Sequence, residues 1–216
     1  MQMNQQPQSI RILALGDSYS IGTGVNEEER WPMQLAAALR MHGLHVSRPS
    51  FIAQNGWTTS GLLAAIPLSD YEMNFGLVTM LIGVNNQYQG LDIEEYDQEF
   101  NLLLKKAVAY ASGNPARVIV LSIPDWGVTP FAAGFDRRQI ASEIDAYNRV
   151  NRRLSNNVGV HYVDITPLSR QIGQKPANLA DDGLHPSGKM YAAWVELVLP
   201  VALRAVVGST GKEMNH

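Results

Sequence analysis

Residues 10–18 read Ile-Arg-Ile-Leu-Ala-Leu-Gly-Asp-Ser, an apolar run that ends in a small polar turn. A short, nearly continuous apolar run of this kind is typical of a strand buried on both faces, as parallel sheets require. The polar residues Asp17 and Ser18 follow it directly. Because open parallel sheets form their sites beyond the carboxyl ends of the strands, this turn is the first place to expect chemistry.

The rest of the chain alternates between strand-like and helix-like segments. Further strands are predicted within 45–54 and at 77–82, 117–123 and 160–165, and helices at 31–41, from 58 or 59 to near 67, at 93–107, at 140–154 and from Ser187 onward. Pro49 would remove a ladder donor, so the second strand should lie at a sheet edge. Pro200 should kink or break the last helix. The alternation predicts one α/β domain with a parallel sheet covered on both faces.

Composition narrows the chemistry. The chain has 216 residues and a mass of 23.8 kDa, enough for one domain, placed at 10–208 between polar tails at 1–9 and 209–216. Its 17 basic and 20 acidic residues give a net charge of -3, which disfavours nucleic-acid binding. With no cysteine, disulfides, thiolate metal sites and cysteine nucleophiles are excluded. Ser, His, Asp, Glu, Asn and backbone groups remain for chemistry.

No membrane or export segment is predicted. The first nine residues are polar and lack a basic region, and the apolar run at 10–16 is too short for a signal-peptide core. The late apolar stretch 192–207 is interrupted by Glu196, Pro200 and Arg204, so no membrane span is expected there. The chain as given is expected to be cytoplasmic, and a trimmed secreted form remains an open alternative. The sequence carries no signal for an oligomeric state.

Polar, glycine-containing turns follow the first three predicted strands. They are Gly16-Asp17-Ser18-Tyr19-Ser20, Gln54-Asn55-Gly56-Trp57 and Gly83-Val84-Asn85-Asn86, and a fourth polar cluster, Asp181-Asp182-Gly183-Leu184-His185-Pro186, precedes the last helix. The glycines fit neither a phosphate-binding loop nor a dinucleotide fingerprint, and no metal-binding motif is present. We therefore expect neither a cofactor nor a metal.

These turns contain the groups that a serine hydrolase needs. Ser18 follows a strand, where a turn into a helix would expose its hydroxyl. Asp182 and His185 are three residues apart, so one loop can supply a base and the carboxylate that orients it. The Asn85 amide and the Gly56 N–H could join the Ser18 N–H around a developing oxyanion.

The four blocks Gly16-Asp17-Ser18, Gly56, Gly83-Val84-Asn85 and Asp182-Gly183-Leu184-His185 resemble the pattern of the SGNH (GDSL-type) hydrolases, in order and spacing from residue 16 to residue 185. The resemblance implies a flavodoxin-like three-layer α/β/α sandwich with a central five-stranded parallel sheet. It also implies that Ser18 is the nucleophile, His185 the base and Asp182 its orienter. The N–H groups of Ser18 and Gly56 and the Asn85 amide would form the oxyanion hole.

Two positions depart from the family pattern, and both lie beside the expected catalytic residues. Tyr19 stands where the first block usually has Leu, and Asn86 where the third usually has Asp. These changes should affect the acyl pocket more than the reaction, so Tyr19 and Asn86, with Trp57 and Leu184, are predicted to contact substrate. Aromatic residues Tyr88, Trp126 and Phe131 are further candidates for pocket walls, the last two in a long loop at 124–136 that could form a lid.

Each motif also has a purely structural explanation. Ser18 could only cap a helix, Asp181 could replace Asp182 as the partner of the histidine, and Asn85 or Gly56 could only shape turns. Taken together, the blocks predict an esterase for small-molecule esters, and the compact chain favours short acyl groups and an open site. A thioesterase, a lysophospholipase or a carbohydrate O-deacetylase could use the same residues. A non-catalytic flavodoxin-like binding module, including a nucleotide binder, is the alternative from another class.

Overall fold

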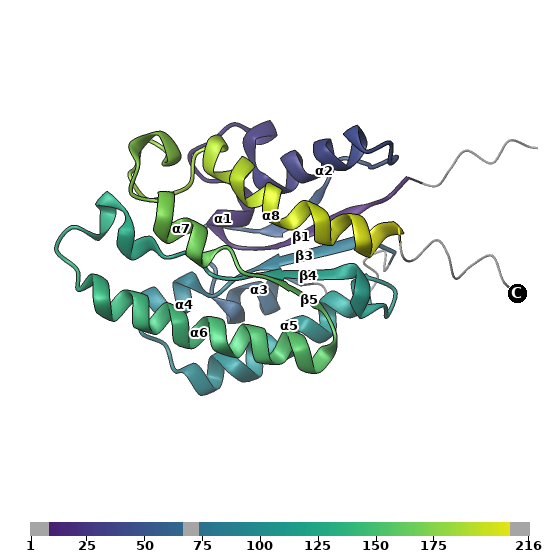
Figure 1. The fold of residues 1–216 in the computed structure, drawn as a ribbon. Helices are drawn as coiled ribbons and strands as arrows, with labels where there is room; N and C mark the ends of the chain where they lie inside the picture. Colours follow the sequence, from purple (N-terminus) through teal and green to yellow (C-terminus); the bar gives the residue numbers. More distant parts are fainter. Residues whose placement is uncertain (1–8, 67–73, 208–216) are drawn as a thin grey trace, which may run out of the picture.

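The computed structural model describes residues 9–66 and 74–207. The expected tails, apart from Ser9, and the predicted helix end at Pro67 lie outside the described residues. Five parallel strands form one sheet in the order β2-β1-β3-β4-β5 (Figure 1). The strands are β1 (Ile12–Gly16), β2 (Ser50–Ala53), β3 (Leu77–Leu81), β4 (Val118–Leu121) and β5 (His161–Val163). This is the flavodoxin-like strand order, which confirms the predicted fold class.

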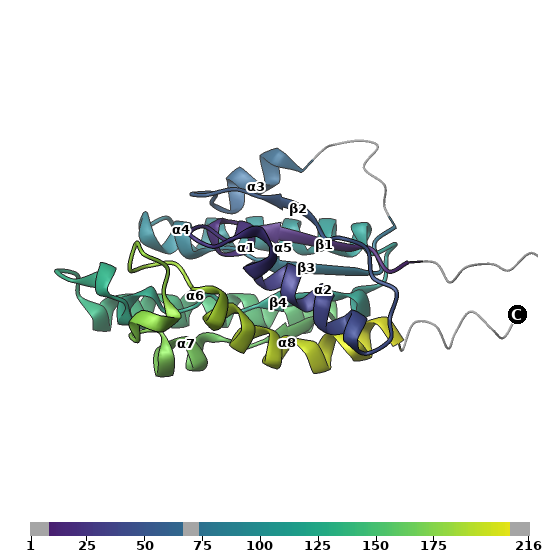
Figure 2. The same cartoon turned by 90° about the horizontal axis from the view of Figure 1, so that it is seen from above.

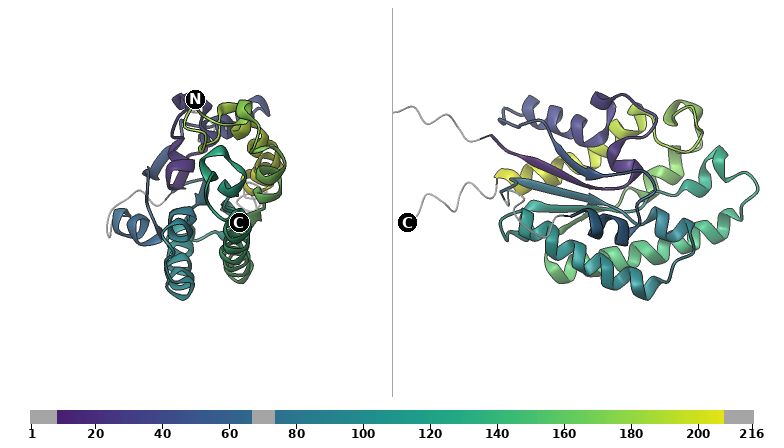
Figure 3. Two further views of the ribbon diagram at one scale, coloured as in Figure 1. Left: turned by 90° about the vertical axis from the view of Figure 1, so that its left-hand side faces the viewer. Right: turned by 180° about the vertical axis from the view of Figure 1, so that it is seen from behind.

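Helices cover both faces of the sheet (Figures 1 and 2). Two long helices, α2 (Trp31–Met41) and α8 (Gly188–Val207), pack together on one face, and α3 (Thr59–Ala65), α5 (Ile93–Tyr110) and α6 (Arg137–Val158) form the other layer. Three short helices, α1 (Ser18–Ile21), α4 (Val84–Tyr88) and α7 (Thr166–Ile172), directly follow β1, β3 and β5. They therefore begin at the edge of the sheet where sites are expected, which faces the viewer in the left panel of Figure 3.

Burial divides the strands into central and edge strands, and β2 lies at an edge as predicted. Every residue of β1, β3 and β4 is buried, whereas β2 and β5 are only partly buried. Pro49 lies just before β2 at the sheet edge, so its missing N–H removes no central ladder bond. In the register, Gly16 pairs with both Ala53 and Leu81. The ends of β1, β2 and β3 are therefore level, and their loops meet.

Strands β4 and β5 are shorter than the apolar runs that predicted them. The N–H of Ile123 donates to Asn148 Oδ1 at 2.8 Å, and the N–H of Ile165 donates to Ser122 Oγ at 2.8 Å. These backbone donors bind side chains instead of a neighbouring strand. Apolar character alone could not reveal where ladder pairing stops.

Helix α8 continues through Pro200 to Val207, so the predicted break does not occur. Pro200 deprives the carbonyl of Glu196 of its helical donor, but both residues are exposed and water can take that place. By length and hydropathy, α8 is a helix that could cross a membrane, and such a signal is weak because core helices share it. Its side chains Tyr191, Trp194 and Val198 are fully buried in the hydrophobic core.

Candidate active site

Ser18 is the first residue of α1, immediately after β1. Asp17 caps the helix, its Oδ1 accepting the N–H of Tyr19 at 3.0 Å. A side chain at Gly16 would lie 2.3 Å from the carbonyl oxygen of Leu81, so only glycine permits this close passage from strand to helix. The turn leaves Ser18 only 7% exposed, in the lining of a pocket. Its position at a helix N-terminus directs backbone N–H groups toward an incoming anion.

The loop before α8 brings Asp182 and His185 together. Oδ1 of Asp182 accepts the N–H groups of Leu184 and His185, each at 2.9 Å, and Oδ2 lies 2.5 Å from His185 Nδ1. Among the described residues, Asp181 makes no hydrogen bond to the histidine, so Asp182 is the partner in this structure. Burial acts to raise the pKa of Asp182, but the hydrogen bonds from His185 and Leu184 outweigh it and lower that pKa. The carboxylate is thus held in its ionised form.

Asn85 and Gly56 approach from the loops after β3 and β2. One N–H of the Asn85 side chain donates to the carbonyl oxygen of Trp57 at 2.9 Å, which fixes the amide and leaves its second N–H available. Gly56 adopts a φ of 79°, a conformation that favours glycine, and a side chain there would meet no atom within 4 Å. Gly56 is therefore required by its backbone conformation and not by crowding.

These groups surround a cavity of about 210 Å³. Its lining is mostly apolar and comprises Ser18, Tyr19, Asn55, Gly56, Val84, Asn85, Tyr88, Trp126, Phe131, Leu184 and His185. Ser18, Asn85 and His185 come from three separate elements and share this one cavity. Within the described residues no hydrogen bond joins Ser18 to His185, and such bonds are often long in unliganded enzymes.

Two of the predicted substrate contacts are absent from the lining. Asn86 is 2% exposed, and its side chain accepts the N–H of Thr59 at 3.0 Å and donates to the Thr59 hydroxyl at 2.7 Å. It ties α4 to the start of α3. Trp57 contributes its carbonyl oxygen to Asn85, while its ring packs beside Gly61. Both residues support the site from behind the lining.

Four aromatic side chains form a cluster beside the cavity: Tyr88, Trp126, Phe131 and Phe135. Their ring centroids lie 5.2–6.4 Å apart. The loop at 124–136 is joined to the histidine loop by the Phe131 N–H, which donates to the carbonyl of Gly183 at 3.2 Å. This loop thus forms a wall of the pocket, as the sequence indicated.

The buried residue Gln87 was not identified from the sequence. Its Oε1 accepts the indole N–H of Trp126 at 2.7 Å, and its Nε2 donates to Glu143 at 2.7 Å. Only its place two residues after Asn85 could have drawn notice to it. Gln87 therefore fixes one aromatic wall of the pocket to α6.

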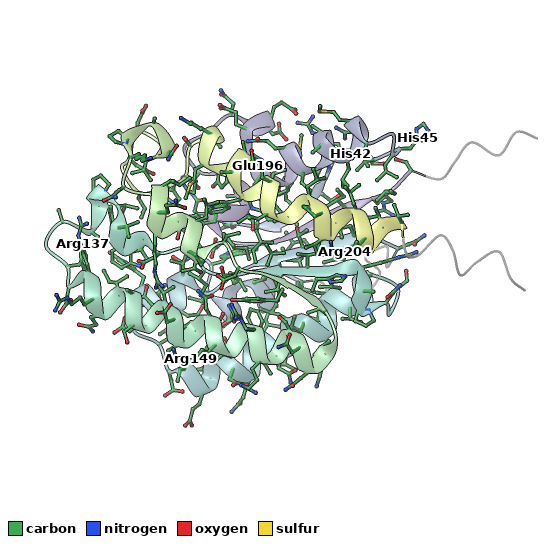
Figure 4. All side chains as sticks on the ribbon, in the orientation of Figure 1. His42, His45, Arg137, Arg149, Glu196 and Arg204 are labelled. Atoms are coloured by element: carbon green, nitrogen blue, oxygen red, sulfur yellow. The ribbon has the colours of Figure 1, made fainter. Side chains whose placement is uncertain are left out.

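Two other histidines do not line this cavity. His42 and His45 are exposed at the opposite end of the molecule from Arg137, which begins α6 (Figure 4). Across residues 9–66 and 74–207 no three His, Asp or Glu side chains gather as metal ligands would.

Asp17, the residue before Ser18, is fully buried. Burial raises its pKa from 3.8 to about 7, although backbone hydrogen bonds oppose the shift. Its Oδ2 has no hydrogen-bond partner in the described part of the chain.

The sequence profile of the GDSL-like lipase/acylhydrolase family matches residues 14–193, from β1 into α8. The chain belongs to this family. The GDSL-like hydrolase is 26% identical to an arylesterase of Vibrio mimicus over 182 residues, which cover 82% of this chain and 80% of that one. The family and this relative make it a carboxylic ester hydrolase.

Solved structures show the same fold. The crystal structure of TesA has a TM-score of 0.70 at 23% identity, covering 90% of this hydrolase and 99% of that chain. The lipase Lip_vut3 from a goat rumen metagenome has a TM-score of 0.72 at 20% identity, covering 89% and 97%.

Proposed function

We propose that this hydrolase cleaves esters of compact carboxylic acids through a covalent acyl-enzyme on Ser18. The observation that carries the proposal is the convergence of Ser18, Asn85 and the Asp182–His185 pair on one apolar cavity. A nucleophile, a base, its orienting carboxylate and an oxyanion donor are what acyl transfer by a serine requires.

In the first step, Ser18 Oγ attacks the carbonyl carbon while His185 Nε2 takes the hydroxyl proton. Asp182 occupies Nδ1, so it fixes the tautomer that leaves Nε2 as the base and stabilises the imidazolium that forms. The carbonyl oxygen becomes an anion held by the N–H groups of Ser18 and Gly56 and by the free N–H of Asn85. Because the Trp57 carbonyl already fixes the amide, it needs little reorganisation as charge develops.

The intermediate collapses when the bond from carbon to the alcohol oxygen breaks. His185 gives its proton to that oxygen, the alcohol leaves, and the acyl group remains on Ser18. Water then attacks the acyl-enzyme with His185 again as base. Breaking the bond to Ser18 returns the proton to the serine and releases the acid.

The apolar lining and the cavity volume of about 210 Å³ support a compact, uncharged acyl group as the substrate. Acyl thioesters, lysophospholipids and O-acetylated carbohydrates are the competing substrates, because the same site chemistry would serve each. Measuring kcat/KM for each of these substrate classes, and for simple alkyl and aryl esters, under the same conditions ranks them as substrates.

Hydrolysis of p-nitrophenyl acetate by the wild type and by Ser18→Ala tests the proposal. We expect activity to fall to background in the variant and a fluorophosphonate probe to label the wild type only. Wild-type turnover by Ser18→Ala would exclude Ser18 as the nucleophile. Absence of both turnover and labelling in the wild type would favour a non-catalytic binding module.

A further inference from the structure

A second, smaller cavity lies behind the catalytic pocket. Its volume is about 20 Å³, room for about one water molecule. Three side chains line both cavities: Tyr19, Trp126 and Leu184. They form the partition between the pocket that holds Ser18 and this second cavity.

Tyr19 is the central member of this partition. Its ring is 3% exposed and makes edge-on contacts with His185 at 5.8 Å and with Trp194 at 6.1 Å between centroids. His185 lines only the catalytic pocket, whereas Trp194 lines only the second cavity. Tyr19 thus has one cavity on each side.

The three members of the partition are held differently. The Trp126 indole is hydrogen-bonded to Gln87, and Leu184 belongs to the loop that Asp182 organises. In the described residues, the Tyr19 side chain makes ring contacts but no hydrogen bond. A smaller apolar residue at this position would therefore open the partition without leaving a buried polar partner unpaired.

The second cavity suits an apolar guest. Three of its polar wall side chains are already paired: Asp125 with Arg170 at 2.8 Å, Thr129 with the carbonyl of Trp126 at 2.7 Å, and Ser169 with the carbonyl of Thr166 at 2.7 Å. The indole N–H of Trp194, another wall residue, has no hydrogen-bond partner in the described part of the chain. Much of the remaining wall is apolar, including Leu179, Pro186 and Met190. A hydrocarbon end placed there would displace at most about one water and break none of these bonds.

We infer that Tyr19 sets the upper size of the acyl group by closing the catalytic pocket off from this cavity. The inference rests on the proposed function and adds the residue that limits the substrate. The acyl group is the part concerned because it stays bonded to Ser18, the residue before Tyr19, after the alcohol has left. A smaller side chain at position 19 would join the two cavities and admit longer acyl chains.

The test is the acyl-chain profile of Tyr19→Leu on p-nitrophenyl acetate, butyrate and octanoate. Losing the contact with His185 lowers turnover of all three, so the measured quantity is the ratio of kcat/KM for octanoate to that for acetate. We expect this ratio to rise by about tenfold or more, since one or two accommodated methylenes give that much discrimination. Tyr19→Phe keeps the ring and should keep the wild-type ratio.

A second series holds the acyl group as acetate and enlarges the alcohol. Tyr19→Leu should leave this profile as in the wild type. An unchanged acyl ratio, or a shift confined to the alcohol series, would overturn the assignment of Tyr19 to the acyl side. Loss of Ser18-dependent hydrolysis in the wild type would instead overturn the proposed function, so the two failures are distinct.

Met190 supplies an independent check, because it lines the second cavity and not the catalytic pocket. Met190→Ala alone should leave the acyl ratio unchanged, since the partition stays closed. Added to Tyr19→Leu, it should raise the ratio further. If Tyr19→Leu does not fold, Tyr19→Met opens the same partition with a flexible side chain. The ratio of kcat/KM for octanoate to that for acetate is then measured on this variant.

Discussion

The side-chain amide of Asn85 donates to the backbone carbonyl of Trp57 at 2.9 Å, across the gap between the loops after β3 and β2. The bond leaves one amide N–H for the pocket that Ser18 and His185 also line. It joins the two loops that carry the proposed oxyanion donors, Gly56 on one and Asn85 on the other. The Asn85 amide is therefore fixed before substrate arrives, as a donor that lowers a barrier by preorganisation must be.

Asn85→Ala should remove one oxyanion donor and lower kcat by about 10²–10³-fold, with little change in KM. Its neighbour Asn86 is the matched control, because it is buried and bonded to Thr59 outside the pocket lining. Asn86→Ala should lose about 1–3 kcal/mol of stability while the folded enzyme keeps its turnover. Steady-state kinetics and thermal unfolding separate the two, and equal kcat losses would contradict the assignment.

Asp182→Asn keeps the side-chain shape but replaces the charged acceptor of His185 Nδ1 with an amide. We expect kcat to fall by up to about 10⁴-fold, since the wrong histidine tautomer is then favoured. The exposed neighbour Asp181 is the control, and Asp181→Asn should turn over like the wild type. Comparable losses in both variants would mean that general loop charge, and not orientation of His185, is what matters.

The lowered pKa of Asp182 fixes how stability and activity should depend on pH. The pKa of Asp182 is lowered in the folded state, so its hydrogen-bonded carboxylate contributes stability above the ordinary value of 3.8 and loses it only as pH falls through the lower folded value. Activity should therefore show no acid limb from Asp182 at or above pH 4. The measurement is the pH profile of kcat/KM. A fall in kcat/KM toward acid pH that lies at or above pH 4 in the wild type and is absent in Asp182→Asn would contradict this expectation.

The convergence of the proposed catalytic residues on one cavity was predictable because each follows a strand or precedes a helix in a polar, glycine-containing turn. Ser18 and Asn85 needed only the rule that parallel strands end at one edge. Asn86 was misleading for the same reason: one residue further on, the helical turn directs it toward Thr59 instead of the pocket. Sequence position identified the loop but not the side that each residue faces.

Tyr19 was expected at the pocket, but its second role could not be foreseen. Its neighbour on the far side, Trp194, lies in α8, and that proximity depends on how α8 crosses the sheet. Trp126 and Gln87 are 39 residues apart and meet only in the folded chain. Contacts of this kind leave no periodic pattern, so the structure was needed to find them.

Gln87→Leu should loosen the aromatic wall without touching the reacting groups. The variant leaves the Trp126 indole N–H and one oxygen of Glu143 without their partner. We expect KM to rise by about tenfold with a smaller change in kcat, since the loss of about 1–2 kcal/mol falls on substrate binding. Gln139→Ala, which removes the bond to the other Glu143 oxygen, is the control. A fall in kcat at constant KM would assign Gln87 to the reaction instead.

Asp17 should make the folded state less stable as pH rises. Its pKa is raised from 3.8 to about 7, so between these values the folded state binds more protons than the unfolded chain, and the unfolding free energy falls with increasing pH. Asp17→Asn keeps an acceptor for the Tyr19 N–H but cannot titrate. The stability of the variant relative to the wild type should therefore rise by roughly 4 kcal/mol between pH 4 and pH 8, because each tenfold difference in proton affinity corresponds to about 1.4 kcal/mol. Denaturant unfolding at both pH values measures this change in stability. Ser20→Ala, at a buried neighbour without a titratable group, is the control and should differ from the wild type by the same amount at each pH. If the stability difference between Asp17→Asn and the wild type does not change with pH, burial does not raise the pKa of this carboxyl.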